Sequence, residues 1–106
     1  MSARKLVNVS NTFSNLEVET RKTSLTLPTE SVNLSKNGIE FHSPSSIAPW
    51  TEMTVELQSP RTAKKIHCTG VVVACAGNRH AGYRVAMLFT SLSRQTQARL
   101  DLLAYS

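Results

Sequence analysis

The hexapeptide Asn33-Leu34-Ser35-Lys36-Asn37-Gly38 joins two short runs of alternating apolar residues. Asparagine and serine side chains bond readily to nearby backbone or to a ligand, and glycine supplies the positive φ that a tight strand-to-strand turn often needs. This composition predicts a turn between two strands, with a polar corner at 33–38 that faces water.

Alternation of apolar and polar residues continues on both sides of this turn and is typical of half-buried β-strands. One run, 66–75, is longer and mainly apolar, and Gly70 inside it predicts a bulge or a close backbone approach. We expect this run to form an antiparallel hairpin with 83–89. The predicted strands are 16–20, 25–27, 32–34, 39–42, 53–58, 66–75 and 83–89.

The C-terminal segment changes from strand spacing to helical spacing. Ser93 is a suitable N-cap, and Leu100, Leu103 and Ala104 then lie on one stripe of a helix. This pattern predicts an amphipathic α-helix at about 93–105. Five to seven short strands closed by such a helix favour a small barrel or a sandwich.

The length of the chain and its N-terminal segment suggest the domain organisation. A chain of 106 residues suits one domain with an adequate core. Residues 1–15 are polar and weakly patterned, which predicts a flexible N-terminal arm, and 16–106 then form the domain. The sequence lacks both an apolar run of about 20 residues and a secretory signal. We therefore expect a cytoplasmic protein without membrane insertion.

The net charge of +5 favours anionic partners such as nucleotides, nucleic acid or acidic protein surfaces. The basic residues are spread along the chain, with doublets at Arg4-Lys5, Arg21-Lys22 and Lys64-Lys65. The sequence has no longer basic block, and its few aromatic residues cannot build a stacking platform for single strands. Specific nucleic-acid binding is therefore not expected.

Catalytic and metal sites are not indicated by the sequence. Ser35 would need a neighbouring base to act as a nucleophile, and nothing brings a histidine to it. Cys68 and Cys75 lie seven positions apart in one strand, so they should point to opposite faces, about 20 Å apart. They cannot form a disulfide with each other, and no second ligand pair has zinc-like spacing. We expect free thiols, no metal, no cofactor and no enzymatic activity.

Trp50 follows Ala48-Pro49 in a loop before a predicted strand. Two interpretations of this residue remain open. The indole can pack as a lid over one end of the barrel. Alternatively, it is exposed and docks a partner, because tryptophan is enriched in interface hot spots.

The order of these elements resembles the PilZ domain from about Leu16 to the end of the chain. The resemblance rests on Asn33-x-Ser35-x-x-Gly38-Ile39, followed by a proline-bearing loop and Met53-Thr-Val-Glu-Leu57. It extends to Gly70-Val-Val-Val73, to Gly82-Tyr-Arg-Val-Ala-Met-Leu-Phe89 and to the C-terminal helix. The family implies a mainly β fold, a small six-stranded antiparallel β-barrel with a C-terminal α-helix.

The resemblance also implies a ligand, because PilZ domains are known for binding the bacterial second messenger cyclic di-GMP. Asn33 and Ser35 would hydrogen-bond this ligand on the barrel surface, and Gly38 would allow the loop its tight path. Basic groups of the N-terminal arm, Arg4 and Lys5, would contribute charge. A protein partner, not identified by any residue, would then be regulated.

The sequence departs from the family pattern at two places. The family places an Arg-x-x-x-Arg motif upstream of the loop, where guanidinium groups clamp phosphates. Here Arg4-Lys5 lies at about the right distance from Asn33, but position 8 is asparagine. In addition, Ala86 stands where the family often has glycine. An alternative function follows, namely a degenerate PilZ domain that binds no nucleotide and acts as an adaptor through Trp50, Phe41 and the C-terminal helix.

Overall fold

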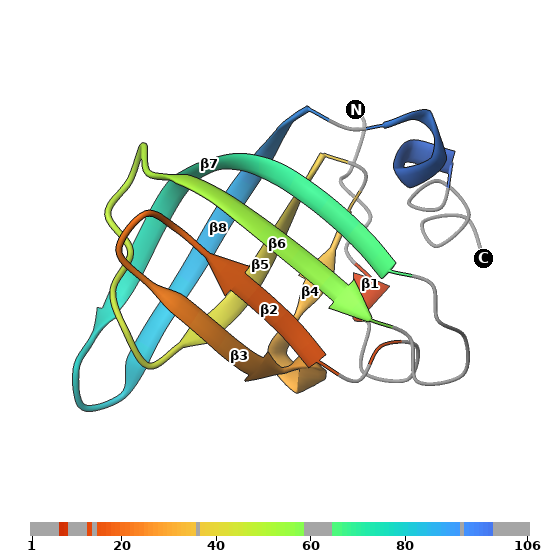
Figure 1. The fold of residues 1–106 in the computed structure, drawn as a ribbon. Helices are drawn as coiled ribbons and strands as arrows, with labels where there is room; N and C mark the ends of the chain where they lie inside the picture. Colours follow the sequence, from red (N-terminus) through yellow and green to blue (C-terminus); the bar gives the residue numbers. More distant parts are fainter. Residues whose placement is uncertain are drawn as a thin grey trace, which may run out of the picture.

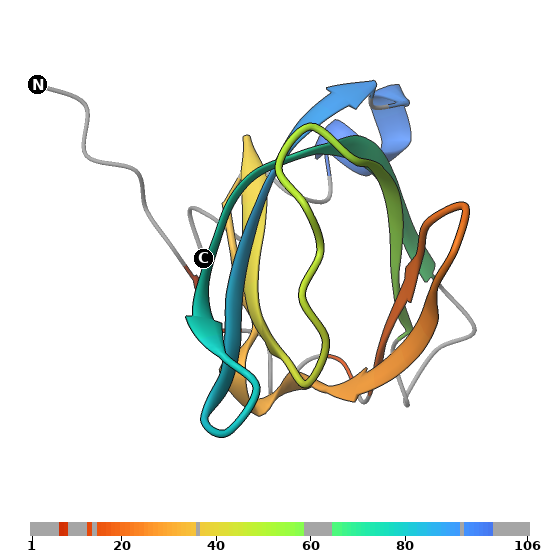
Figure 2. The same cartoon turned by 90° about the vertical axis from the view of Figure 1, so that its left-hand side faces the viewer.

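One antiparallel sheet, curled into a half-barrel, makes up most of the computed structural model (Figures 1 and 2). The structure describes residues 7–8, 13, 15–35, 37–58, 65–91 and 93–98. The strand order is β1-β4-β5-β8-β7-β6-β2-β3, with every neighbouring pair antiparallel. The elements are β1 (Val7–Asn8), β2 (Asn15–Glu19), β3 (Ser24–Pro28), the 3-10 helix η1 (Thr29–Ser31), β4 (Asn33–Leu34), β5 (Gly38–Ser43), β6 (Glu52–Gln58), β7 (Lys65–Asn78) and β8 (Gly82–Ser91).

The concave face of the sheet carries the hydrophobic core. Successive side chains of a strand point to opposite faces, so the apolar members of each alternating run gather on one side. Each buried aliphatic or aromatic side chain contributes about 1.5–3 kcal/mol relative to an exposed one. The largest fully buried side chains are Phe41, Leu16, Ile39, Met53, Leu57, Met87, Val18, Val32, Val55 and Val72.

The predicted fold class is confirmed as mainly β, antiparallel and followed by a short C-terminal helix. The predicted count of six strands is wrong, because the sheet has eight strands when the two-residue strands β1 and β4 are included. Residues 94–98 are helical, and Ser93 caps them as predicted, since its Oγ accepts a 3.1 Å hydrogen bond from the Thr96 amide. The rest of the helix predicted at 93–105 lies outside the described residues.

Parts of the predicted N-terminal arm contact the sheet. Val7 and Asn8 form β1 and pair with Leu34 and Asn33 of β4, and Phe13 belongs to the buried core. The remaining residues before Asn15 lie outside the described part, so the domain boundary stays a prediction. Within the residues that the structure describes, no helix has the length and apolarity needed to cross a membrane.

The alternation of side chains between the two faces of the sheet is reversed part of the way along strand β7. Its register against β8 shifts between Thr69 and Gly70 and again between Val72 and Ala74, as expected of β-bulges. The second shift reverses the alternation, so Cys75 packs against the core on the same side as Cys68. The prediction that the two thiols point to opposite faces is therefore wrong. Both are free, as predicted.

Burial raises the pKa of the Cys68 thiol from its ordinary 9.0 to about 12. The folded protein therefore holds this proton more tightly than the unfolded chain does. The contribution of this thiol to the free energy of unfolding is fully present below pH 9 and is lost as the pH rises from 9 toward 12. In chemical denaturation, we expect unfolding to become easier by about 1.4 kcal/mol per pH unit from this group. The Cys68→Val variant cannot ionise there and should lose this part of the slope; an unchanged slope would contradict the assignment.

Candidate functional site

The 33–38 turn is held together by the side chain of Ser35. Its Oγ accepts hydrogen bonds from the amides of Asn37 (3.2 Å) and Gly38 (3.1 Å), and it donates to the Gly38 carbonyl (3.3 Å). The backbone amide of Ser35 donates to the same carbonyl at 2.9 Å. A hydroxyl has one donor and two acceptor positions, so all three are used within the turn. Ser35 has only 6% of its surface exposed, and Gly38 is buried as well. The prediction that the 33–38 corner faces water is therefore wrong for these two residues, whereas Asn37 is exposed.

Gly38 is required by a close backbone approach. A Cβ at this position would overlap the carbonyl oxygen of Met87 on the neighbouring strand β8. Among the described glycines only Gly77 and Gly82 have positive φ, so the expectation that Gly38 supplies a positive φ is wrong. The carbonyl of Asn37 also accepts a 2.9 Å hydrogen bond from the Phe89 amide, which fastens the turn to β8.

Asn33 lies half-buried on the convex face of the sheet. Its neighbour Leu34 points into the core, and in register Asn33 faces Glu40, which in turn faces Ala86. Among the residues that the structure describes, the Asn33 amide group has no side-chain hydrogen-bond partner. Asn33, Glu40 and Ala86 therefore form a row across β4, β5 and β8 on the outer face.

Arg84 places a positive charge beside this row. It is exposed on β8, in register with His42 of β5, and its Nη1 donates a 3.1 Å hydrogen bond to the carbonyl of Ser31. Ser31 precedes Asn33 by two residues, and its Oγ accepts a 3.2 Å bond from the His42 amide. The guanidinium thus reaches across β5 toward the segment that leads into the turn. Arginine suits phosphates through its planar set of N–H donors.

Sequence reasoning did not single out Glu40 or Arg84 as site residues. The tight turn implies that Asn33 faces Glu40, so this pair was accessible from the hairpin spacing. The position of Arg84 depends on the pairing of β5 with β8. These strands are far apart in the chain, so no local sequence pattern predicts this position. Arg4 and Lys5, the predicted basic groups of the arm, lie outside the described residues.

The two aromatic candidates for partner contact differ in their exposure to solvent. Phe41 is 0% exposed and belongs to the core, so its proposed role as a contact surface is wrong. Trp50 is 77% exposed, which excludes the packed-lid interpretation and supports the exposed one.

The side chains of two of the three histidines have hydrogen-bond partners among the described residues. His67 pairs through Nδ1 with Glu56 at 3.4 Å on the surface, and His42 Nε2 bonds the Ala81 carbonyl at 2.9 Å. No group of three or more possible metal ligands occurs in the described part of the chain.

Comparison with known proteins supports the assignment of the fold. The family model described as PilZ domain matches residues 4–106. The Bacillus subtilis inhibitor of motility (MotI/DgrA) has a similar structure, with a TM-score of 0.72, 14% identity, and coverage of 99% of this chain and 50% of that one. A tetrameric PilZ-domain pathogenic protein of Xanthomonas campestris, self-assembled through a helical bundle, gives a TM-score of 0.63, 24% identity and coverage of 80% and 51%.

At these identities the likeness to the solved structures shows the fold alone. The chain spans about half the length of each of these two proteins. No curated protein matches the sequence.

Proposed function

The chain belongs to the PilZ domain family, and on this premise we propose that it is a signalling receptor that binds cyclic di-GMP and regulates a partner protein. The observation that supports this most is the Arg84 guanidinium, which bonds the Ser31 carbonyl at 3.1 Å close to the half-buried Asn33. In this proposal Arg84 binds the phosphates in place of the Arg-x-x-x-Arg motif, which the sequence does not contain. The proposed role is non-catalytic, and a cytoplasmic location stays a prediction.

The row on the convex face suits the chemistry of a guanine dinucleotide. An asparagine amide both donates and accepts, so Asn33 can bond a guanine edge, while the Glu40 carboxylate only accepts and matches the N–H groups of that edge. Arg84 lies two residues before Ala86 on β8, which separates them by about 7 Å along the strand. Its N–H groups that do not bond Ser31 are available for a phosphate. The small side chain of Ala86 leaves space for the ligand between these groups.

Ser35 and Gly38 take part in this proposal mainly through the shape of the turn. Ser35 would have to give up one of its bonds within the turn to bond the ligand directly, so we assign it a positioning role first. Arg4 and Lys5 add positive charge for the phosphates in this proposal.

Calorimetric titration with cyclic di-GMP tests the proposal. We expect saturable binding, weakened roughly tenfold to a hundredfold in Asn33→Ala and in Arg84→Ala, because each loses bonds to a polar or charged ligand group. Arg94→Ala, which removes the same charge from the C-terminal helix, is the matched control and should bind as the wild type does. Absence of heat at about 100 μM ligand would reject the receptor function.

A second function, an adaptor that binds no nucleotide, is favoured by one specific observation. Trp50 exposes 77% of its surface, as an interface residue does. A negative titration would leave this adaptor function as the proposal.

A further inference from the structure

Trp50 adopts a backbone conformation that suits glycine. Its φ is +72°, and it is the only residue other than glycine with a positive φ in the described part of the chain. The left-handed region places Cβ too close to the following carbonyl, so it is unfavourable for a bulky side chain. Strain of this kind persists where the surrounding structure holds it, and it concentrates at functional sites.

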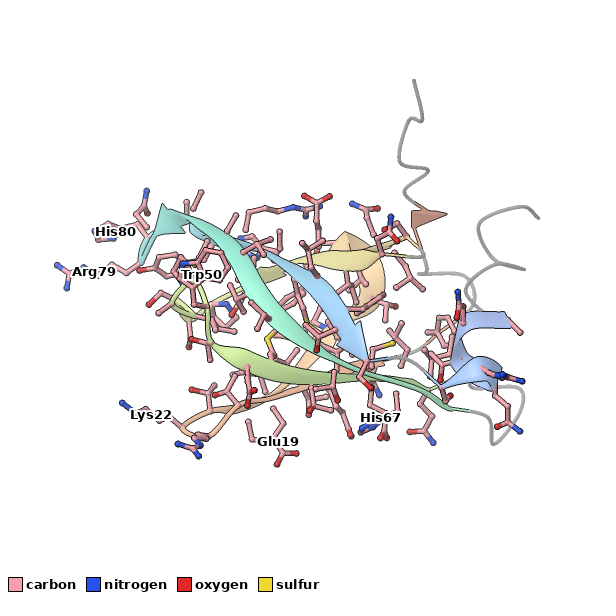
Figure 3. The ribbon with its side chains drawn as sticks, turned by 90° about the horizontal axis from the view of Figure 1, so that it is seen from above. Glu19, Lys22, Trp50, His67, Arg79 and His80 are labelled. Atoms are coloured by element: carbon pink, nitrogen blue, oxygen red, sulfur yellow. The ribbon has the colours of Figure 1, made fainter. Side chains whose placement is uncertain are left out.

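The side chain of Trp50 contributes little to the packing of the fold. It is the one large hydrophobic side chain that is exposed among the described residues, at 77%. Its backbone is nevertheless held firmly, because its amide donates to the Val72 carbonyl at 2.6 Å and the Thr51 amide donates to Ala48 at 3.2 Å. The Val72 amide donates in turn to Thr51 at 3.0 Å. The indole is thus exposed to solvent, while hydrogen bonds hold its backbone in place. Figure 3 shows Trp50 at the end of the molecule that also carries Lys22.

An open cavity of about 540 Å³ adjoins this loop. Its walls are the β2–β3 turn, residues 20–23, and the segments 46–48 and 51–52 on either side of Trp50. The turn is tight, since the Thr20 amide donates to Thr23 at 2.8 Å and Thr20 Oγ1 accepts from the Thr23 amide at 3.1 Å. Loop 44–51 and this turn lie at the same end of the half-barrel, on the left in Figure 1.

The basic wall of the cavity is free to bind an anion. Arg21 and Lys22 are both exposed, and neither pairs with a carboxylate among the described residues. Glu52 lines the facing wall, so an anion would be held on the side of the turn. Two cations against one carboxylate leave this cavity positive, in keeping with the net charge of +5.

We propose that Trp50 and the adjoining cavity, whose wall includes Arg21 and Lys22, dock an acidic segment of a partner protein; these residues and the cavity are called here the Trp50 surface. The indole enters an apolar pocket of the partner, and carboxylates of the partner meet Arg21 and Lys22. Buried tryptophan surrounded by complementary charge is a common interface anchor. A single aromatic residue provides no stacking platform for nucleic acid. The Trp50 surface uses neither Asn33 nor Arg84, so this inference does not depend on nucleotide binding. It rests on the adaptor function proposed above and names the chemistry of its partner.

Photocrosslinking from the cavity tests this inference. The probe is p-benzoylphenylalanine in place of Ser46, which is exposed and lines the cavity, in the full chain expressed at native level in its own cells. We expect an adduct whose crosslinked peptide, identified by mass spectrometry, is an acidic segment of another protein. Its yield should fall at least tenfold with Trp50→Gly and with Arg21→Glu/Lys22→Glu.

The control is Arg94→Glu, which makes a charge reversal on the helix at the other end of the half-barrel and should leave the yield unchanged (Figure 1). Trp50→Gly relieves the backbone strain and should melt at a higher temperature than the wild type, so a lost adduct cannot be ascribed to unfolding. Four outcomes overturn the proposal: no adduct, an adduct with a second copy of this chain, an adduct with nucleic acid, or equal yields in all variants.

Discussion

Replacing Gly38 with alanine is expected to lower the free energy of unfolding by about 3 kcal/mol, the upper part of the range for an overpacked site. The new methyl group would overlap the Met87 carbonyl oxygen, and a backbone atom in a paired strand cannot move aside as a flexible side chain can. Strands β5 and β8 would have to separate at the point where the turn is fastened. Thermal melting should show a midpoint roughly 10–20 °C lower.

Asn37→Ala is the matched control for this substitution. It changes the adjacent, exposed position and keeps the backbone bond from Phe89 to the Asn37 carbonyl. We expect its stability to stay within about 0.5 kcal/mol of the wild type. If Gly38→Ala melted as this control does, the close approach of the turn to Met87 would be refuted.

The second large effect is expected from Ser35→Ala, which should destabilise the fold by about 2 kcal/mol. Removing the hydroxyl takes away the acceptor for the Asn37 and Gly38 amides and a donor to the Gly38 carbonyl. Urea unfolding measures the loss as a lower midpoint with an unchanged slope.

Ser24→Ala provides the comparison, since Ser24 is an exposed serine at the start of β3. It should change stability by less than about 0.5 kcal/mol. Equal losses for the two serines would mean that the hydroxyl of Ser35 does not organise the turn. Because the turn positions Asn33, we also expect Ser35→Ala to weaken cyclic di-GMP binding.

The strands that could be predicted are those in which apolar and polar residues alternate over enough positions to show a period of two. Phe41, Met53 and Met87 lie in runs with a period of two, and the structure buries all three. Gly70 was also interpretable: the register shifts beside it, and a Cβ there would overlap the Leu88 carbonyl oxygen. Strand β1 has only two residues, too few to show any period, and it was not predicted.

Other features depend on information that a local pattern does not contain. The bulge between Val72 and Ala74 adds one residue to an apolar run without changing its composition, so Cys75 was assigned to the wrong face. The position of Arg84 follows from long-range pairing, and the φ of Trp50 follows from the bonds of its loop to β7. The candidate site could therefore be predicted at the turn, while its cation and the Trp50 surface needed the structure.

The central claim is that cyclic di-GMP binds on the convex face beside Asn33, and amide chemical shifts of the ¹⁵N-labelled protein test it most directly. On titration with cyclic di-GMP, the account predicts shifts for Asn33, Glu40 and Ala86 and for the side chain of Arg84, with residues 20–23 and 46–52 unchanged. A spectrum without shifts at about 100 μM ligand, or with shifts confined to the Trp50 surface, would contradict it.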